Sequence, residues 1–227
     1  MSAVRSIRHP LARALLVLTF STGLVDAVSY LGLGRVFTAN MTGNIVLLGF
    51  GVAGSEGLPV VAPLVSLGAF LAGSAAGGVL AAATRDRHPI HVARALAIET
   101  LLVLAAAIVA AAIDVRPGTF SGDAVIALLA LAMGVRNATV RTLGVPDLTT
   151  TVLTMTLTGL AADSPVAGGS GSGSVRRIAA VLAMLTGAVA GALLLEISLV
   201  LPLLAAAALA LLVALAYVPS ARAPGEP

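Results

Sequence analysis

The chain reads VFTANMTGNIVLLGFGVAG from Val36 to Gly54, and this stretch decides which fold the rest of the sequence can build. Asn40, Thr42 and Asn44 interrupt it near its start. A helix that crosses a bilayer needs roughly 20 consecutive apolar residues, so the unbroken remainder is too short. The stretch either spans poorly or enters the membrane and leaves on the same side.

A second interrupted segment of the same kind covers residues 146–162, with Asp147 at its start and six threonines along it. The remaining apolar runs are long enough to span a bilayer. There are six of them, at residues 11–33, 59–83, 92–113, 122–143, 178–195 and 197–218. The sequence therefore predicts an all-α membrane protein with six transmembrane helices and two re-entrant half-helices.

Composition supports a protein whose solvent is lipid. Hydrophobic residues make up 59% of the chain and charged residues 10%, with a mean hydropathy of +1.07. There is no cysteine, and the three histidines lie beside arginines in polar segments, which excludes a thiolate metal site and disfavours a serine–histidine site. No set of nucleophile, base and orienting group is recognisable. We therefore expect no cofactor and no enzyme activity, including activity on lipids.

Arginine placement predicts the topology, because short cytoplasmic loops collect basic residues. All thirteen basic residues are arginines in short clusters, a pattern typical of such loops and not of nucleic-acid binding. If both interrupted segments re-enter, only Arg35 and Arg116 lie outside, and the inside holds eleven: Arg5, Arg8, Arg13, Arg85, Arg87, Arg94, Arg136, Arg141, Arg176, Arg177 and Arg222. If both segments span, seven lie inside and six outside. The first arrangement keeps the expected asymmetry, so we adopt it, and it places both termini in the cytoplasm.

The two halves of the chain share a pattern. Gly23-Leu-Val-Asp-Ala27 resembles Gly134-Val-Arg-Asn-Ala138, Thr38 to Thr42 aligns with Thr150 to Thr154, and Gly73/Gly77 align with Gly187/Gly191. Three spans separate the corresponding elements, so the second copy has the opposite orientation. This predicts an inverted 3+3 repeat, an architecture in which many secondary transporters bind substrate near the midplane.

The predicted organisation follows from these elements. Residues 1–10 form a cytoplasmic N-terminal segment, 11–113 the first membrane repeat and 122–218 the second, inverted repeat. A Gly- and Ser-rich stretch at residues 163–175 is expected to be a flexible cytoplasmic linker, and residues 219–227 a disordered tail.

The candidate substrate-binding residues lie where the half-helices begin. In the first segment they are Asn40, Thr42 and Asn44, which also fit a plain N-cap. In the second they are Thr150, Thr151 and Thr154, with Asn137 on the preceding span. Two half-helix N-termini favour a polar or anionic solute.

Two charged residues in the spans call for partners. Asp26 is an acid within lipid, which is costly, and we expect it either to couple a proton or cation or to reach water at the outer end. Arg136 either pairs with Asp26 or reaches the cytoplasmic interface as an ordinary anchor. Glu99 is a weaker candidate that we expect near the headgroups.

Gly73, Gly77, Gly187 and Gly191 form small-xxx-small pairs that permit close helix packing. They fit packing between the repeats or a homodimer.

The GLVDA and FTANMTGN motifs, together with the later Gly-rich span, resemble the YoaK family of bacterial integral membrane proteins, a family of unknown function. The resemblance implies a bacterial inner-membrane protein with about six helices and supplies no substrate. The interrupted segments also look like the crossing half-helices of nucleobase and sulfate transporters, a likeness of fold alone.

Two hypotheses follow. The first is a small secondary transporter or facilitator of a polar or anionic solute, with its site between the half-helices. The second is a non-transporting membrane scaffold or lipid-binding protein whose half-helices only pack.

Overall fold

The computed structural model describes residues 9–84, 88–144 and 153–222, which fold into helices joined by turns, with no strand in these ranges. Six of the described helices are long and apolar enough to cross a membrane. Their bounds are α1 (Pro10–Ala27) with its π-helical extension η2 (Val28–Gly32), α3 (Val61–Ala83), α4 (His88–Ala112), α5 (Phe120–Leu143), α7 (Ser174–Ile197) and α8 (Val200–Arg222). The prediction of a multi-pass helical membrane protein with six spans is confirmed.

The two interrupted segments contain short helices. The first is α2 (Met41–Val52), with 12 residues, and the second is α6 (Leu153–Ala162), with 10. At about 1.5 Å per residue they extend only about 18 and 15 Å, well short of the roughly 30 Å of a hydrocarbon core.

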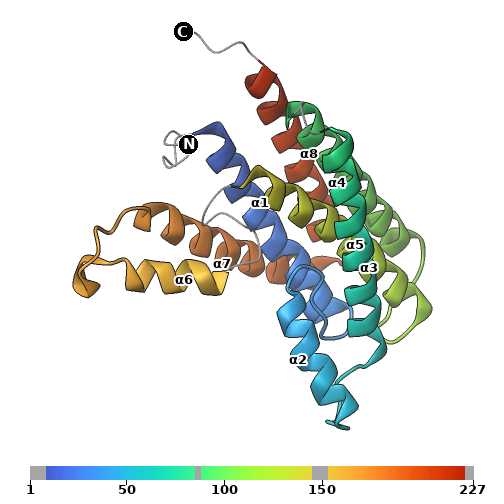
Figure 1. The fold of residues 1–227 in the computed structure, drawn as a ribbon. Helices are drawn as coiled ribbons and strands as arrows, with labels where there is room; N and C mark the ends of the chain where they lie inside the picture. Colours follow the sequence, from blue (N-terminus) through green and yellow to red (C-terminus); the bar gives the residue numbers. More distant parts are fainter. Residues whose placement is uncertain (1–8, 85–87, 145–152, 223–227) are drawn as a thin grey trace.

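Helices α1 and α5 form the centre of the bundle. Helix α1 packs against α7 and α8, α5 packs against α3 and α4, and α4 packs against α8. The short helices lie at the edge, α2 on α3 and α6 on α7, and Figure 1 shows α6 alongside α7. Because α1 packs mainly on helices of the second half and α5 on helices of the first half, neither half has a core of its own.

Glycines permit close approach at two helix crossings. In α3, a Cβ on Gly73 would overlap the Leu131 carbonyl oxygen of α5, and a Cβ on Gly77 would lie 2.7 Å from the Ala138 Cβ. Helix α7 meets α1 in the same way, with Gly187 against Phe20.

The same four glycines were candidates for a homodimer. Gly73, Gly77, Gly187 and Gly191 are buried inside one chain, against α5 and α1. Packing within the chain is therefore what the structure describes. A homodimer would have to use other residues, and it stays a prediction.

We expect Gly73→Ala to destabilise the protein by about 1–3 kcal/mol, because the added methyl group forces two backbones apart. Gly78, in the same helix, has no atom within 4 Å of the position that a methyl group would take, so it is the matched control. Gly78→Ala should be neutral or slightly stabilising, since Ala favours a helix more than Gly by roughly 0.5–1 kcal/mol. Thermal unfolding in detergent measures both, and equal effects of the two substitutions would contradict the prediction.

The connection between α6 and α7 differs from the predicted flexible linker. It contains a 3₁₀ turn, η3 (Pro165–Ala167), and the Gly171 N–H donates to the Asp163 carbonyl oxygen at 2.8 Å. Arg177 of α7 donates to the Gly159 carbonyl oxygen at 2.6 Å and pairs with the Asp163 carboxylate at 2.7 Å. These contacts tie α6 to α7 through a compact turn.

Candidate functional site

Asp26 holds the non-helical backbone that precedes α2. Its Oδ1 accepts hydrogen bonds from the Thr38 N–H at 3.2 Å and the Ala39 N–H at 3.0 Å. Backbone outside a helix has no internal partners, and within a membrane each unpaired group is costly. The buried carboxylate therefore satisfies two of these donors. Asp26 lies inside the bundle, at 5% exposure.

Asn44 has a structural role that differs from the predicted one. Its side chain is fully buried, accepts from the Phe37 N–H at 2.8 Å and donates to the Phe37 carbonyl oxygen at 2.6 Å. It also contacts the Ser66 hydroxyl of α3 at 3.1 Å, and that hydroxyl donates to the same Phe37 carbonyl at 2.7 Å. Because these bonds occupy the amide, Asn44 fastens the extended segment to α2 and α3 and does not line a binding site.

Asn40 and Thr42 begin α2. The Asn40 side chain accepts from the Gly43 N–H at 3.3 Å, so the plain N-cap interpretation is confirmed for this residue. Gly43 is needed here because a Cβ would lie 2.8 Å from the Phe37 ring. Asn40 and Thr42 are exposed, so their remaining polar groups stay available.

A pocket lies between the starts of α2 and α6, beside α1. It has a volume of about 480 Å³, within the range of small-molecule sites. Its polar lining comes from Thr22, Asp26, Tyr30, Asn40, Thr42 and Thr154. We call it the central pocket. Of the predicted site residues, the structure brings four together here: Asp26, Asn40, Thr42 and Thr154.

The other predicted residues of the second half do not join this set. Thr150 and Thr151 lie outside the described residues. Asn137 donates to the Met133 carbonyl oxygen of its own helix at 2.8 Å and does not line the central pocket.

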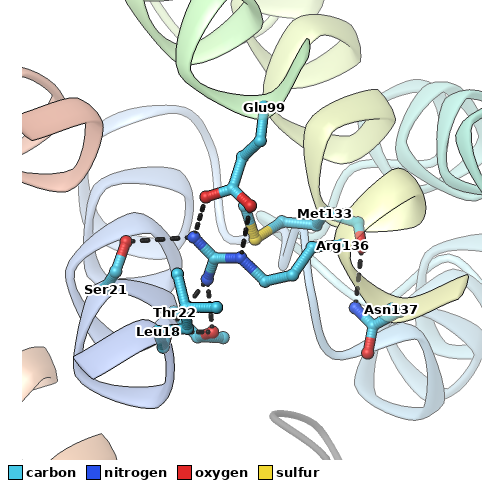
Figure 2. A network of polar contacts seen from close by, with 7 residues as sticks. All are labelled: Leu18, Ser21, Thr22, Glu99, Met133, Arg136 and Asn137. Atoms are coloured by element: carbon cyan, nitrogen blue, oxygen red, sulfur yellow. Dashed lines mark hydrogen bonds and ion pairs between the residues drawn. The ribbon is translucent and has the colours of Figure 1, made fainter. Parts of the chain in front are cut away.

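Arg136 does not pair with Asp26, because its carboxylate partner is Glu99 of α4. The Arg136 Nε donates to Glu99 Oε2 at 2.9 Å, and the terminal nitrogen Nη2 pairs with Oε1 (Figure 2). Side-chain exposure is 2% for Arg136 and 1% for Glu99. The alternatives of an interfacial Arg136 and a headgroup Glu99 are therefore both wrong.

The rest of the guanidinium binds α1. Nη1 donates to the Leu18 carbonyl oxygen and to the Thr22 hydroxyl, both at 2.9 Å, and Nη2 donates to the Ser21 hydroxyl at 3.2 Å. With the two bonds to Glu99, all five guanidinium donors are used. Figure 2 shows the cluster joining α1, α4 and α5. We call Arg136, Glu99, Ser21 and Thr22 the arginine cluster.

Sequence reasoning missed the importance of Glu99, Ser66 and Thr22. An acid in the apolar run of α4 was a signal for Glu99, since such a residue needs a partner. Ser66 and Thr22 gave no signal, because single hydroxyl residues are common in membrane helices and usually bond to their own backbone.

Residues 14–216 match the family described as "Protein of unknown function (DUF1275)". The chain is also similar to the UPF0700 transmembrane protein YoaK of Bacillus subtilis (strain 168), with 35% identity over 148 residues. This alignment covers 65% of the chain and 64% of that relative, so it spans just under two thirds of the relative's length. No solved structure matches the chain. The chain is thus a YoaK-like multi-pass membrane protein and belongs to the DUF1275 family of proteins of unknown function.

Proposed function

We propose that the protein is a small secondary transporter or facilitator of a small polar solute, with its binding site in the central pocket. The observation that carries this proposal is the meeting of Asp26, Asn40, Thr42 and Thr154 around one cavity. These residues come from α1 and from both interrupted segments. Polar groups within a bilayer are costly and are generally retained where they bind water, ions or solute.

Two short helices support the re-entrant assignment. Residues 33–40 are non-helical, Arg35 has a φ of +58°, and α2 then begins at Met41. A non-helical entry followed by a helix of 12 residues fits a segment that turns back inside the membrane, and α6 is shorter still.

Equivalent glycine contacts support the inverted repeat. Gly23 of α1 packs on Gly187 of α7, and its counterpart Gly134 of α5 packs on Gly73 of α3. Gly191 lies against Ala27, as Gly77 lies against Ala138. Two crossings built from corresponding residues are what a repeated unit would produce, and repeat interfaces are where many transporters bind substrate.

Chain topology is proposed from the arginines. The start of α1 and the end of α8 lie at one end of the bundle (Figure 1), together with the buried Leu11 and Val213. Of the eleven arginines predicted for that side, Arg136 is interior, and Arg5, Arg8, Arg85 and Arg87 lie outside the described residues. The described remainder numbers six, Arg13, Arg94, Arg141, Arg176, Arg177 and Arg222, against Arg35 and Arg116 on the other side. The positive-inside rule then supports cytoplasmic termini. The bacterial relative supports a bacterial inner (cytoplasmic) membrane as the location.

The polar groups of the central pocket limit the chemical class of solute that it can bind. Oδ1 of Asp26 is used by backbone donors, and no described residue donates a hydrogen bond to Oδ2. A carboxylate oxygen accepts hydrogen bonds, so it favours a solute or ion that donates them. An anionic solute would have to bind together with a proton or cation at Asp26, which makes Asp26 the candidate for ion coupling.

Water access tests the proposal, because a transport site must be wet. The chain has no cysteine, so single cysteines can be introduced at Thr42 and Thr154 and treated with a cationic methanethiosulfonate reagent in lipid nanodiscs. We expect both positions to react at least about tenfold faster than lipid-facing controls, since only water-exposed thiols ionise and meet a charged reagent.

Leu71→Cys and Val79→Cys are the matched controls, because both side chains lie on the exposed apolar face of α3, at 66% and 71% exposure. If Thr42→Cys and Thr154→Cys are as unreactive as these controls, the centre is dry. That outcome would contradict transport and support the scaffold hypothesis.

A further inference from the structure

One face of α1 and its extension lines the central pocket. Thr22, Asp26 and Tyr30 are spaced four residues apart, so their side chains lie above one another along the helix. Thr22 belongs to the arginine cluster at one end, and Asp26 lies in the middle. Tyr30 is the last of the three and lies toward the end of the span that is remote from the chain termini.

Tyr30 also lines a second pocket, beyond the central one. This outer pocket has a volume of about 710 Å³ and is formed by Tyr30, Gly34, Arg35, Pro59 and Pro117, among others. It includes residues of the α2–α3 and α4–α5 connections, which lie at that same end. Tyr30 is common to the linings of the two pockets and therefore forms part of the wall between them.

The wall is an aromatic pair. The rings of Tyr30 and Phe37 stack with their centroids 4.9 Å apart and an interplanar angle of 24°. Phe37 is held by its backbone, since Asn44 and Ser66 bind its N–H and carbonyl groups. One ring of the pair is thus fixed to α2 and α3.

The other ring sits on irregular backbone. Tyr30 belongs to the π-helix η2, and the Tyr30 carbonyl accepts from the Arg35 N–H at 3.0 Å, where the chain leaves the helix. π-Helical turns are rare and are frequently found at functional sites, where a small change in winding re-aims a side chain. The tyrosine is therefore carried by irregular backbone, whereas Phe37 is held by side chains of α2 and α3.

At the arginine-cluster end of the central pocket, the described residues pack closely. The space beside Arg136 and Glu99 has a volume of only about 20 Å³, which holds about one water molecule. Its neighbours Leu15, Leu18 and Leu96 are buried in an apolar cluster. The described residues at that end therefore leave much less space than those around the outer pocket.

We infer that Tyr30 and Phe37 form the outer gate of the central pocket, with Tyr30 the residue that controls passage from the outer pocket. The inference rests on the proposed function. It adds a specificity-determining residue that the sequence did not indicate. Opening requires the Tyr30 ring to leave the stack, while the Asp26 bonds to Thr38 and Ala39 keep the backbone under Phe37 in place.

The test uses Thr42→Cys in nanodiscs as a reporter of access to the central pocket. A charged methanethiosulfonate reagent cannot cross the hydrocarbon, so it must arrive through an aqueous path. Combining Tyr30→Ala with Thr42→Cys should raise the rate of labelling by at least about tenfold, because it removes the moving half of the gate. Tyr30→Phe, which keeps the stacked ring, should leave the rate within about twofold of the reporter alone.

Two further variants keep the test decisive. Phe37→Ala removes the other ring and should also speed labelling, which guards against misfolding caused by Tyr30→Ala alone. Leu31→Ala is the matched control, because Leu31 lines only the outer pocket and is 59% exposed. It should leave the rate unchanged.

The outcomes separate the gate from the proposed function. If Thr42→Cys reacts readily and neither aromatic substitution changes its rate, the gate is overturned while the wet pocket stands. If Thr42→Cys stays unreactive in every variant, the pocket is dry, and both the gate and the transport proposal are overturned.

Discussion

Arg136→Met is expected to lower the free energy of unfolding by about 3–5 kcal/mol, the typical cost of leaving one member of a buried ion pair without its partner. Glu99 would remain as an unpaired carboxylate at 1% exposure. Helix α1 would also lose its bonds from the guanidinium at Leu18, Ser21 and Thr22. We expect the midpoint of thermal unfolding in detergent to fall on the order of 10 °C.

Arg141→Met is the matched control, because Arg141 lies on the same helix and is exposed. It should change the free energy of unfolding by no more than about 0.5 kcal/mol. Combining Arg136→Met with Glu99→Met should recover much of the loss, since a buried ion pair replaced by apolar side chains is often tolerated. A single Arg136→Met variant as stable as Arg141→Met would show that the ion pair is not formed as described.

Asp26→Ala and Asp26→Asn are expected to separate the structural role of this residue from its charge. Alanine leaves the Thr38 and Ala39 N–H groups without a partner, at about 1–3 kcal/mol for each group. Asparagine keeps an acceptor oxygen in place, so its unfolding midpoint should stay close to that of the unmodified protein. The unfolding midpoint should be highest for the unmodified protein, slightly lower for Asp26→Asn and clearly lower for Asp26→Ala.

The effect of the Asp26 charge can be measured as the rate at which charged reagents label Thr42→Cys in the central pocket. We expect the ratio of the labelling rates of a cationic and an anionic reagent to fall by about tenfold in Asp26→Asn, because a carboxylate in a low-dielectric pocket attracts cations. Glu196→Gln removes an exposed acid that does not line the pocket and should leave the ratio unchanged. An unchanged ratio in Asp26→Asn would rule out Asp26 as the coupling group.

Asp26 and Arg136 show how far a site can be predicted from the sequence. The cost of a charge in lipid correctly marked Asp26 and Arg136 as needing partners, and proximity in the repeat pattern suggested that they pair. Instead, Arg136 lies opposite a residue 37 positions away in the chain, and Asp26 binds backbone N–H groups 12 and 13 positions ahead. The rotation of each helix about its axis decides which side chains pair. The hydropathy of a segment carries no information about that rotation.

Asn44 makes the same point within a single motif. Asn40, Thr42 and Asn44 look equivalent in the sequence, as alternating polar residues at a helix start. On a helix, however, residues two positions apart point in different directions, so Thr42 faces the central pocket while Asn44 turns toward Ser66 and Phe37. Thr42 lines the pocket, and Asn44 holds the backbone.

Hydropathy alone was sufficient to establish a six-span helical membrane protein with two short interrupted helices, because lipid requires each span to satisfy its own backbone and local composition reports this directly. The small-residue spacing also correctly indicated close packing. Only the folded chain decided that α1 and α5 exchange partners between halves, that Glu99 neutralises Arg136, and that Tyr30 stands between two pockets. Those features depend on contacts between residues distant in sequence, whose geometry is set by how all the helices pack at once.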